Sequence, residues 1–142
     1  MSYYHPAIYF LLSMMLVLPV TVSANEFECT IKNVLRLNET GNIVRHDWVA
    51  NYQDRKFTVE RETGRVLRTT ALKQRLSNYN RKSIPHVVDY GDKNGSLQAI
   101  TLFEEDGSYA ALQIDNLSKG SNMPFFYRTN IGMILTGLCN NA

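Results

Sequence analysis

Apolar and polar residues alternate along much of the chain after residue 25, which is the pattern of half-buried β-strands. The longest such run covers residues 26–37 and is interrupted only at Asn33 and Val34. Its expected inward face consists of Phe27, Cys29, Ile31, Leu35 and Leu37. The first predicted strand therefore directs Cys29 toward the core.

Turn signals divide the rest of the chain into further strands. A turn at residues 38–42 precedes a second predicted strand at residues 43–52, and two more strands are expected at 125–129 and 131–139. Residues 70–80 differ, because Leu72 and Leu76 stand four apart. That spacing fits two turns of helix, and an ordered loop fits this stretch equally well.

Two hairpins have turns that predict a register. The turn at residues 61–65, with Gly64 at a position of positive φ, sets Val59 opposite Leu67. The Asp106-Gly107 turn predicts a hairpin whose paired residues form one apolar face. Its predicted pairs are Phe103 with Ala110, Thr101 with Leu112, and Ala99 with Ile114.

The chain has two cysteines, Cys29 near the expected mature N-terminus and Cys139 near the C-terminus. Such a pair in an exported chain predicts one structural disulfide rather than a metal motif. If the bond joins the first and last strands, these strands are neighbours, as in a closed meander. We therefore predict an all-β domain, a single small antiparallel barrel of about 8–9 strands, up-and-down and lipocalin-like in outline. A β-sandwich is the alternative.

Residues 1–24 have the features of a cleavable signal peptide, with an apolar core from Ala7 to Leu18 and small residues before Asn25. Residues 25–142 then form a single β-barrel domain with no transmembrane segment in the mature chain. The leader and the cysteine pair together predict a periplasmic or secreted protein.

Charge is unevenly distributed, although the net charge is only +2. Residues 55–82 contain nine basic side chains against Glu60 and Glu62, whereas residues 83–115 contain six acids against Lys93. Clustered cations can bind phosphates, anionic glycans or acidic proteins, and a solvated basic loop is the plainer alternative. The candidate binding residues are Arg65, Arg68, Lys73, Arg75, Tyr79, Arg81 and Lys82.

Catalytic signals are weak. His46 and Asp47 are neighbours on a predicted strand and so point to opposite faces, and His86 with Asp89 has no metal-ligand spacing. The acids at 104–106 lie at a predicted turn, where carboxylates are ordinarily solvated. No nucleophile elbow or phosphate-binding glycine loop is present in the sequence, so we expect no catalytic residues, no metal and no cofactor.

Several short motifs resemble a group of proteins. They are Phe27-x-Cys29, Phe57-x-Val59-x-Arg61-x-Thr63-Gly64, Asp106-Gly107 with Leu112-x-Ile114, Pro124-Phe125 and Thr136-Gly137-x-Cys139. Together they are similar to uncharacterised small exported β-rich proteins of Gram-negative bacteria. The resemblance implies a periplasmic or secreted setting and implies no activity. A fainter likeness is to periplasmic lysozyme inhibitors, which are also small disulfide-tied barrels.

These observations favour an exported, non-catalytic binding protein. Its partner would be a periplasmic protein or an anionic lipid or glycan, not nucleic acid, held by the basic 65–82 segment and the loops at one barrel end. The second hypothesis is an apolar-ligand carrier with a cavity inside the barrel. The residues that would line that cavity are Phe27, Ile31, Leu35, Phe57, Val59, Leu112 and Ile114. An enzyme with a dispersed site is the third hypothesis.

Overall fold

The computed structural model describes residues 25–67, 76–92 and 95–142 of the chain. In this part of the chain nearly all regular structure is β, with one four-residue helix and one 3-10 turn. The strands are β1 (Glu26–Leu37), β2 (Ile43–Arg45), β3 (Lys56–Glu60), β4 (Val66–Leu67), β5 (His86–Tyr90), β6 (Leu97–Leu102), β7 (Tyr109–Ile114), β8 (Met123–Arg128) and β9 (Ile134–Asn141). The helix α1 spans Val49–Tyr52 and the 3-10 turn η1 spans Leu117–Lys119.

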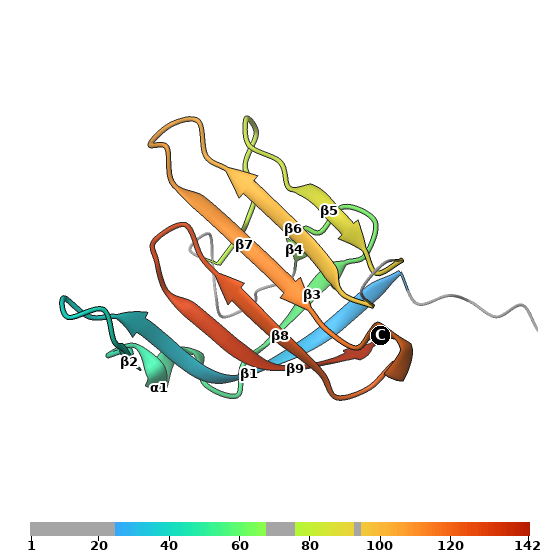
Figure 1. Cartoon of the computed structure of the whole chain (residues 1–142), viewed down its shortest axis with the longest axis horizontal. Helices are drawn as coiled ribbons and strands as arrows, with labels where there is room; N and C mark the ends of the chain where they lie inside the picture. The colour runs from blue at the N-terminus through green and yellow to red at the C-terminus, as the bar shows by residue number, and fades with distance from the viewer. Residues whose placement is uncertain (1–24, 68–75, 93–94) are drawn as a thin grey trace, which may run out of the picture.

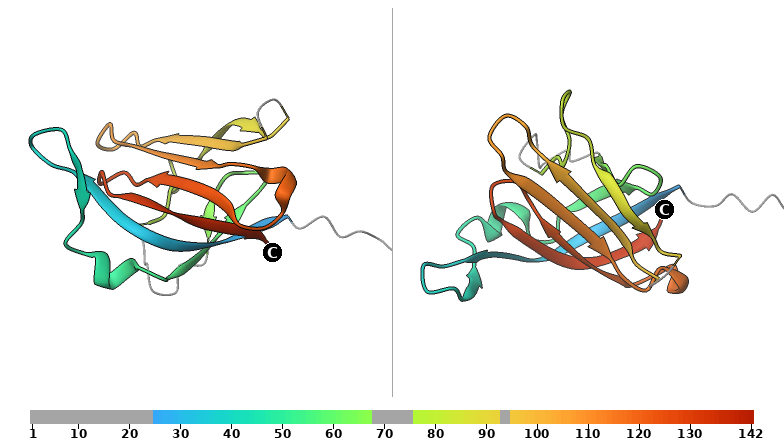
Figure 2. Two further views of the ribbon diagram at one scale, coloured as in Figure 1. Left: turned by 60° about the horizontal axis from the view of Figure 1, so that its bottom comes forward. Right: turned by 45° about the horizontal axis from the view of Figure 1, so that its top comes forward.

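All nine strands belong to one antiparallel sheet with the order β4-β3-β1-β9-β8-β7-β6-β5, and β2 pairs with the far end of β1. The sheet curls on itself, so that β6 and β7 lie across from β1 and β9 (Figures 1 and 2). This curled, barrel-like sheet confirms the predicted fold class. The hydrogen-bonded path ends at β4 and β5, so the barrel is partly open between them.

The first and last strands are neighbours, as predicted from the cysteine pair. Cys29 lies directly opposite Cys139 in the β1–β9 ladder, with 3.9 Å between the Cα atoms, and the two form a disulfide. Both side chains are fully buried, so the bond lies inside the barrel. It joins two strands that are 110 residues apart in sequence.

A β-bulge in β1 accounts for the interruption seen in its sequence pattern. Ile31 pairs with Gly137 and Asn33 pairs with Thr136, which leaves Lys32 as the extra residue. An extra residue inverts the alternation, so Val34 becomes a core residue with no exposed surface. The prediction that Leu37 belongs to the inward face is wrong, since its side chain is 58% exposed.

Buried side chains of the described strands form one contiguous cluster inside the barrel. Phe57 packs edge-to-face against Phe125, with ring centroids 5.2 Å apart, and it also contacts Tyr127 at 6.2 Å. Of the seven residues expected to line an internal cavity, all except Leu35 belong to this packed core. The packing favours a solid core over a hollow carrier.

Both predicted hairpins exist, but their registers differ from the predictions. In the β6–β7 hairpin, Thr101 pairs with Ala110 and Ala99 with Leu112, a shift of two residues that keeps the same apolar face. In the β3–β4 hairpin, Val59 pairs with Val66 rather than Leu67. That one-residue shift changes faces, so Val66 is buried and Leu67 only half-buried.

The reason for both shifts is the length of the turns. Gly107 N donates to Phe103 O and Gly64 N donates to Glu60 O, so each turn has four residues and ends in a glycine. The predicted strand at residues 43–52 is also too long. It ends at Arg45 and is followed by α1, whose Tyr52 packs into the core.

The two ends of the sheet meet through a turn rather than through a ladder. Gly64, with φ of +68°, lies so close to β6 that an added Cβ would come within 2.6 Å of the Ala99 Cβ. Val87 and Pro85 lie on the same side. The free edge of β4 is occupied by the buried side chain of Asn78, which accepts from Val66 N and donates to Gly64 O.

Gly137→Ala is expected to destabilise the protein by about 3 kcal/mol, because overpacking against backbone cannot be relieved by a rotamer change. An added Cβ would overlap the carbonyl oxygen of Thr30, and it would also come within 3.0 Å of Lys32 N. Gly41→Ala is the control, since nothing lies within 4 Å of its added Cβ, although Gly41, unlike Gly137, has a positive φ that an alanine adopts with strain. That variant should lose only about 1–2 kcal/mol in urea unfolding. A loss at Gly137 no larger than the loss at Gly41 would contradict the close approach.

Reduction of the Cys29–Cys139 disulfide is expected to lower the free energy of unfolding by roughly 4–5 kcal/mol, because the bond closes a loop of 110 residues in the unfolded chain. Urea titrations with and without reductant measure the difference. The double variant Cys29→Ala/Cys139→Ala serves as the control, and its stability should not respond to reductant.

Candidate functional site

The described residues of the basic segment do not form a single cationic surface. The guanidinium of Arg65 stacks over Tyr79, with 5.2 Å from Cζ to the ring centroid. Arg81 and Lys82 are exposed and lie in two different depressions. Three further predicted binding residues, Arg68, Lys73 and Arg75, lie outside the described residues.

Residues 76–83 cover one end of the barrel, here called the distal end, together with the turns at 103–108 and 129–133. Leu76 is fully buried, and its carbonyl oxygen accepts a hydrogen bond of 2.5 Å from the Tyr127 hydroxyl. Ser83 is also buried, and its hydroxyl accepts from Glu104 N at 3.2 Å. The segment is thus attached to both β8 and the β6–β7 turn.

This attachment places basic and acidic residues side by side. Arg81 lines a depression of about 400 Å³ with Glu105 and Asp106, and Lys82 lines a second one with Glu104. The side chain and backbone N–H of Ser108 lower the pKa of Asp106 below its ordinary value, which favours the charged form. The charge segregation of the sequence therefore becomes a mixed-charge surface in three dimensions.

The residues considered for catalysis are not brought together. His46 lines a groove beside the β1–β2 ribbon, whereas His86 lies on the outer face of β5. Within the described ranges, no group of three or more His, Cys, Asp or Glu side chains could hold a metal ion. His46 Nδ1 accepts from Trp48 N at 3.0 Å, so this imidazole is oriented by its own turn and not by Asp47.

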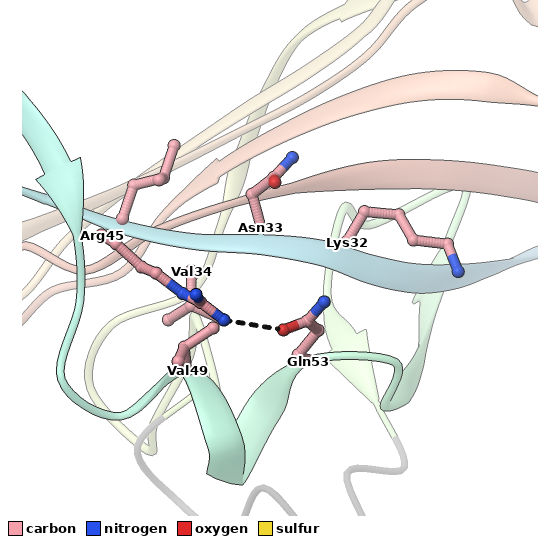
Figure 3. A pocket seen from close by; sticks show the side chains of 7 residues that line it. Lys32, Asn33, Val34, Arg45, Val49 and Gln53 are labelled. Atoms are coloured by element: carbon pink, nitrogen blue, oxygen red, sulfur yellow. Dashed lines mark hydrogen bonds between the residues drawn. The ribbon is translucent and has the colours of Figure 1, made fainter.

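A further depression, of about 350 Å³, lies where the β1 bulge faces β2 and α1 (Figure 3). Figure 3 shows Val34 directed toward Val49 of α1, while Asn33 points to the other side of β1. The polar side chains that line this depression have partners within the protein. Arg45 donates to Gln53 at 3.4 Å, and Lys32 pairs with Asp54 at 2.9 Å. This depression follows from the bulge and offers a ligand few free groups.

Sequence reasoning missed an apolar surface on the outside of the barrel, here called the β5–β6 face. It comprises Ile84, Val88, Ile100 and Leu102, which are 62%, 57%, 44% and 70% exposed. These residues line a depression of about 480 Å³ together with Lys82, Glu104 and His86, the last of which lies directly opposite Ile100 in the β5–β6 ladder. An alternating strand normally places polar residues on its outer face, so four exposed aliphatic side chains together indicate an interaction surface.

No protein-family model, curated protein or solved structure matches this chain. Among the residues that the structure describes, no helix is long and apolar enough to cross a membrane. The site must therefore be interpreted from its geometry alone.

Tyr127→Phe tests the attachment of the 76–83 segment. The variant leaves the buried Leu76 carbonyl without its partner, so it should lose about 1–3 kcal/mol of stability at pH 7. Burial raises the pKa of Tyr127 well above its ordinary value of 10.0, so the folded protein keeps the phenol neutral while the unfolded chain ionises it. Wild-type stability then falls above pH 10, and the advantage over the variant should shrink by about 1.4 kcal/mol at pH 11.

Urea titrations of both proteins at pH 7 and pH 11 measure this difference. All other tyrosines are common to the two proteins, so their titration cancels in the comparison. A constant difference between the two pH values would contradict the burial of a neutral phenol.

Proposed function

We propose that the chain is an exported, non-catalytic binding protein that recognises a protein partner through the β5–β6 face and the adjoining distal end. The β5–β6 face is the observation that carries this proposal. Full burial of an exposed Leu or Ile contributes roughly 1.5–3 kcal/mol, so four neighbouring aliphatic side chains offer a partner a favourable apolar contact, from which the cost of association is subtracted.

The rim of this face favours a protein over an anionic polymer as the partner. Lys82 and Glu104 border the same depression, and Arg81 lies near Glu105 and Asp106. A polyanion would meet three carboxylates beside the two exposed cations, whereas a protein surface can present charges of both signs. Arg81 and Lys82 of the basic segment thus belong to a rim that carries charges of both signs.

Two features support export. A structural disulfide such as the buried Cys29–Cys139 bond is typical of oxidising compartments, and the pattern of residues 1–24 is that of a signal peptide. The packed interior supports recognition on the outside of the barrel, since the described core residues leave little room for an internal ligand.

Site-specific photo-crosslinking in the protein's native cells tests the proposal. A benzophenone side chain at Val88 should give a protein adduct, whereas one at Leu138, which is 37% exposed on the outside of β9, should not. Leu102→Ser should weaken the adduct-forming interaction at least tenfold, because it removes the most exposed aliphatic group of the face. Equal adducts from both positions, or none from Val88, would contradict the proposal.

A second variant separates the β5–β6 face from the basic segment. Arg81→Glu should change binding less than Leu102→Ser does, since Arg81 already has two acids beside it. If Arg81→Glu weakened binding more than Leu102→Ser did, and binding depended strongly on salt, the basic segment and not the β5–β6 face would be the binding site. Sedimentation velocity of the purified protein shows whether the partner is a second copy of the chain.

A further inference from the structure

A second groove is lined by residues of the β1–β2 ribbon and of the β8–β9 turn. Figure 1 shows this ribbon extending beyond the rest of the sheet. The volume of the groove is about 720 Å³, which is within the range of small-molecule sites. Leu37 and Ile43 are cross-strand partners in the ribbon, and Ile131 lies at the tip of the turn. These three side chains are 58%, 61% and 52% exposed.

The floor of the groove is also apolar. Phe126 on β8 and Ile134 on β9 belong to it, and they continue the surface formed by the three aliphatic walls. The β1 bulge explains why a wall residue such as Leu37 is outside the core at all, because the extra residue Lys32 inverts the alternation of β1. A long apolar chain could therefore lie along this groove without entering the barrel.

The charged groups that line the groove are all basic. The guanidinium of Arg128 lies over the Tyr109 ring, with 3.9 Å from Cζ to the ring centroid, and its Nη1 donates to Tyr109 O at 2.8 Å and to Thr129 O at 3.4 Å. None of these contacts is with a carboxylate, so the positive charge of Arg128 is not neutralised by the described residues around it. An arginine fixed in this way presents its remaining N–H groups as a preorganised anion site.

Arg36 and His46 add donors at the same groove. Arg36 lies 3.9 Å from Asp47, but that carboxylate is 84% exposed and is not part of the groove lining, so the pair is weak. His46 Nδ1 accepts the Trp48 N–H, which leaves the ring proton on Nε2 as a donor. Among the described residues that line this groove there is no Asp or Glu.

We infer that this groove binds a long-chain fatty acid, with the acyl chain against the aliphatic walls and the carboxylate on Arg128. An apolar groove in which Arg36 and Arg128 are the charged lining residues, with no Asp or Glu beside them in the lining, matches an anionic amphiphile in both parts. The site adjoins the β5–β6 face, because Tyr109 pairs with Leu102 in the β6–β7 ladder, but the residues that line the two depressions do not overlap. Its apolar ligand lies outside the packed core rather than inside the barrel. It therefore adds a small-molecule ligand to the protein partner proposed above.

Titration of the purified protein with sodium oleate, below the concentration at which oleate forms micelles, tests the inference. Trp48 is the only tryptophan, and its ring lies 5.0 Å from that of His46, so its fluorescence reports on the groove. Oleate should bind saturably with a change in this fluorescence, and calorimetry should give the same affinity. Methyl oleate, which has no charge, should bind at least tenfold more weakly because it cannot pair with Arg128.

Three variants locate the site. Leu37→Asn and Ile131→Asn should each weaken oleate binding about tenfold, and neither should unfold the protein because both side chains are more than half exposed. Ile84→Asn is the matched control, since Ile84 is 62% exposed on the β5–β6 face, and it should leave oleate affinity unchanged.

Four results would overturn the inference. They are no saturable oleate binding, equal affinity for methyl oleate, sensitivity to Ile84→Asn without sensitivity to Leu37→Asn, and preferential binding of phosphatidylglycerol vesicles over monomeric oleate. The last result would mean that the groove contacts a membrane surface. The oleate variants Leu37→Asn and Ile131→Asn line a different depression from the crosslinking position Val88, so loss of oleate binding leaves the proposed protein partner untouched, and the reverse also holds.

Discussion

The rest of the structure depends on the contact between β1 and β9. Gly137 lets the two backbones approach so closely at the bulge that any other residue would overlap Thr30, and the buried disulfide joins the same strands two residues away. Because β1 and β9 are the first and last strands of the domain, their pairing fixes the sheet at its middle. The open ends of the sheet then fall at β4 and β5, where Gly64 and the buried side chain of Asn78 complete the barrel without a ladder.

The core and the β1 bulge bear on both proposed sites. Phe57, Phe125 and Tyr127 pack against one another inside the barrel, which is why both sites are proposed on its outside. The β1 bulge then moves Leu37 to the outside, where it pairs with Ile43 on a ribbon that extends beyond the barrel. One extra residue therefore both shapes the first strand around the core and creates an apolar surface at its far end.

The fold could be predicted from the sequence because alternation and the cysteine pair constrain it independently. Period-2 patterns located most strands, and two cysteines on the first and last strands implied their contact. The registers could not be predicted as well, because the turns ending in Gly64 and Gly107 have four residues, and the glycine alone does not reveal that length. The β5–β6 face was missed for a related reason: in a strand such as β5, apolar residues occur at successive positions, and only the structure shows that Val87 packs toward the core while Val88 is exposed.

Charge shows most clearly what a sequence pattern leaves undetermined. The basic run and the acidic turns are separate along the chain, yet Ser83 bonds Glu104 N and so brings Arg81 and Lys82 next to three carboxylates. The fields of neighbouring opposite charges largely offset one another at a distance, and salt screens what remains over a Debye length of roughly 8–10 Å at ordinary ionic strength. A partner approaching the distal end therefore meets little net field, and apolar contact with short-range charge pairing must supply the affinity. At the groove under the β1–β2 ribbon the opposite holds, because Arg128 is fixed by an aromatic ring rather than by an acid and keeps its charge available to a ligand.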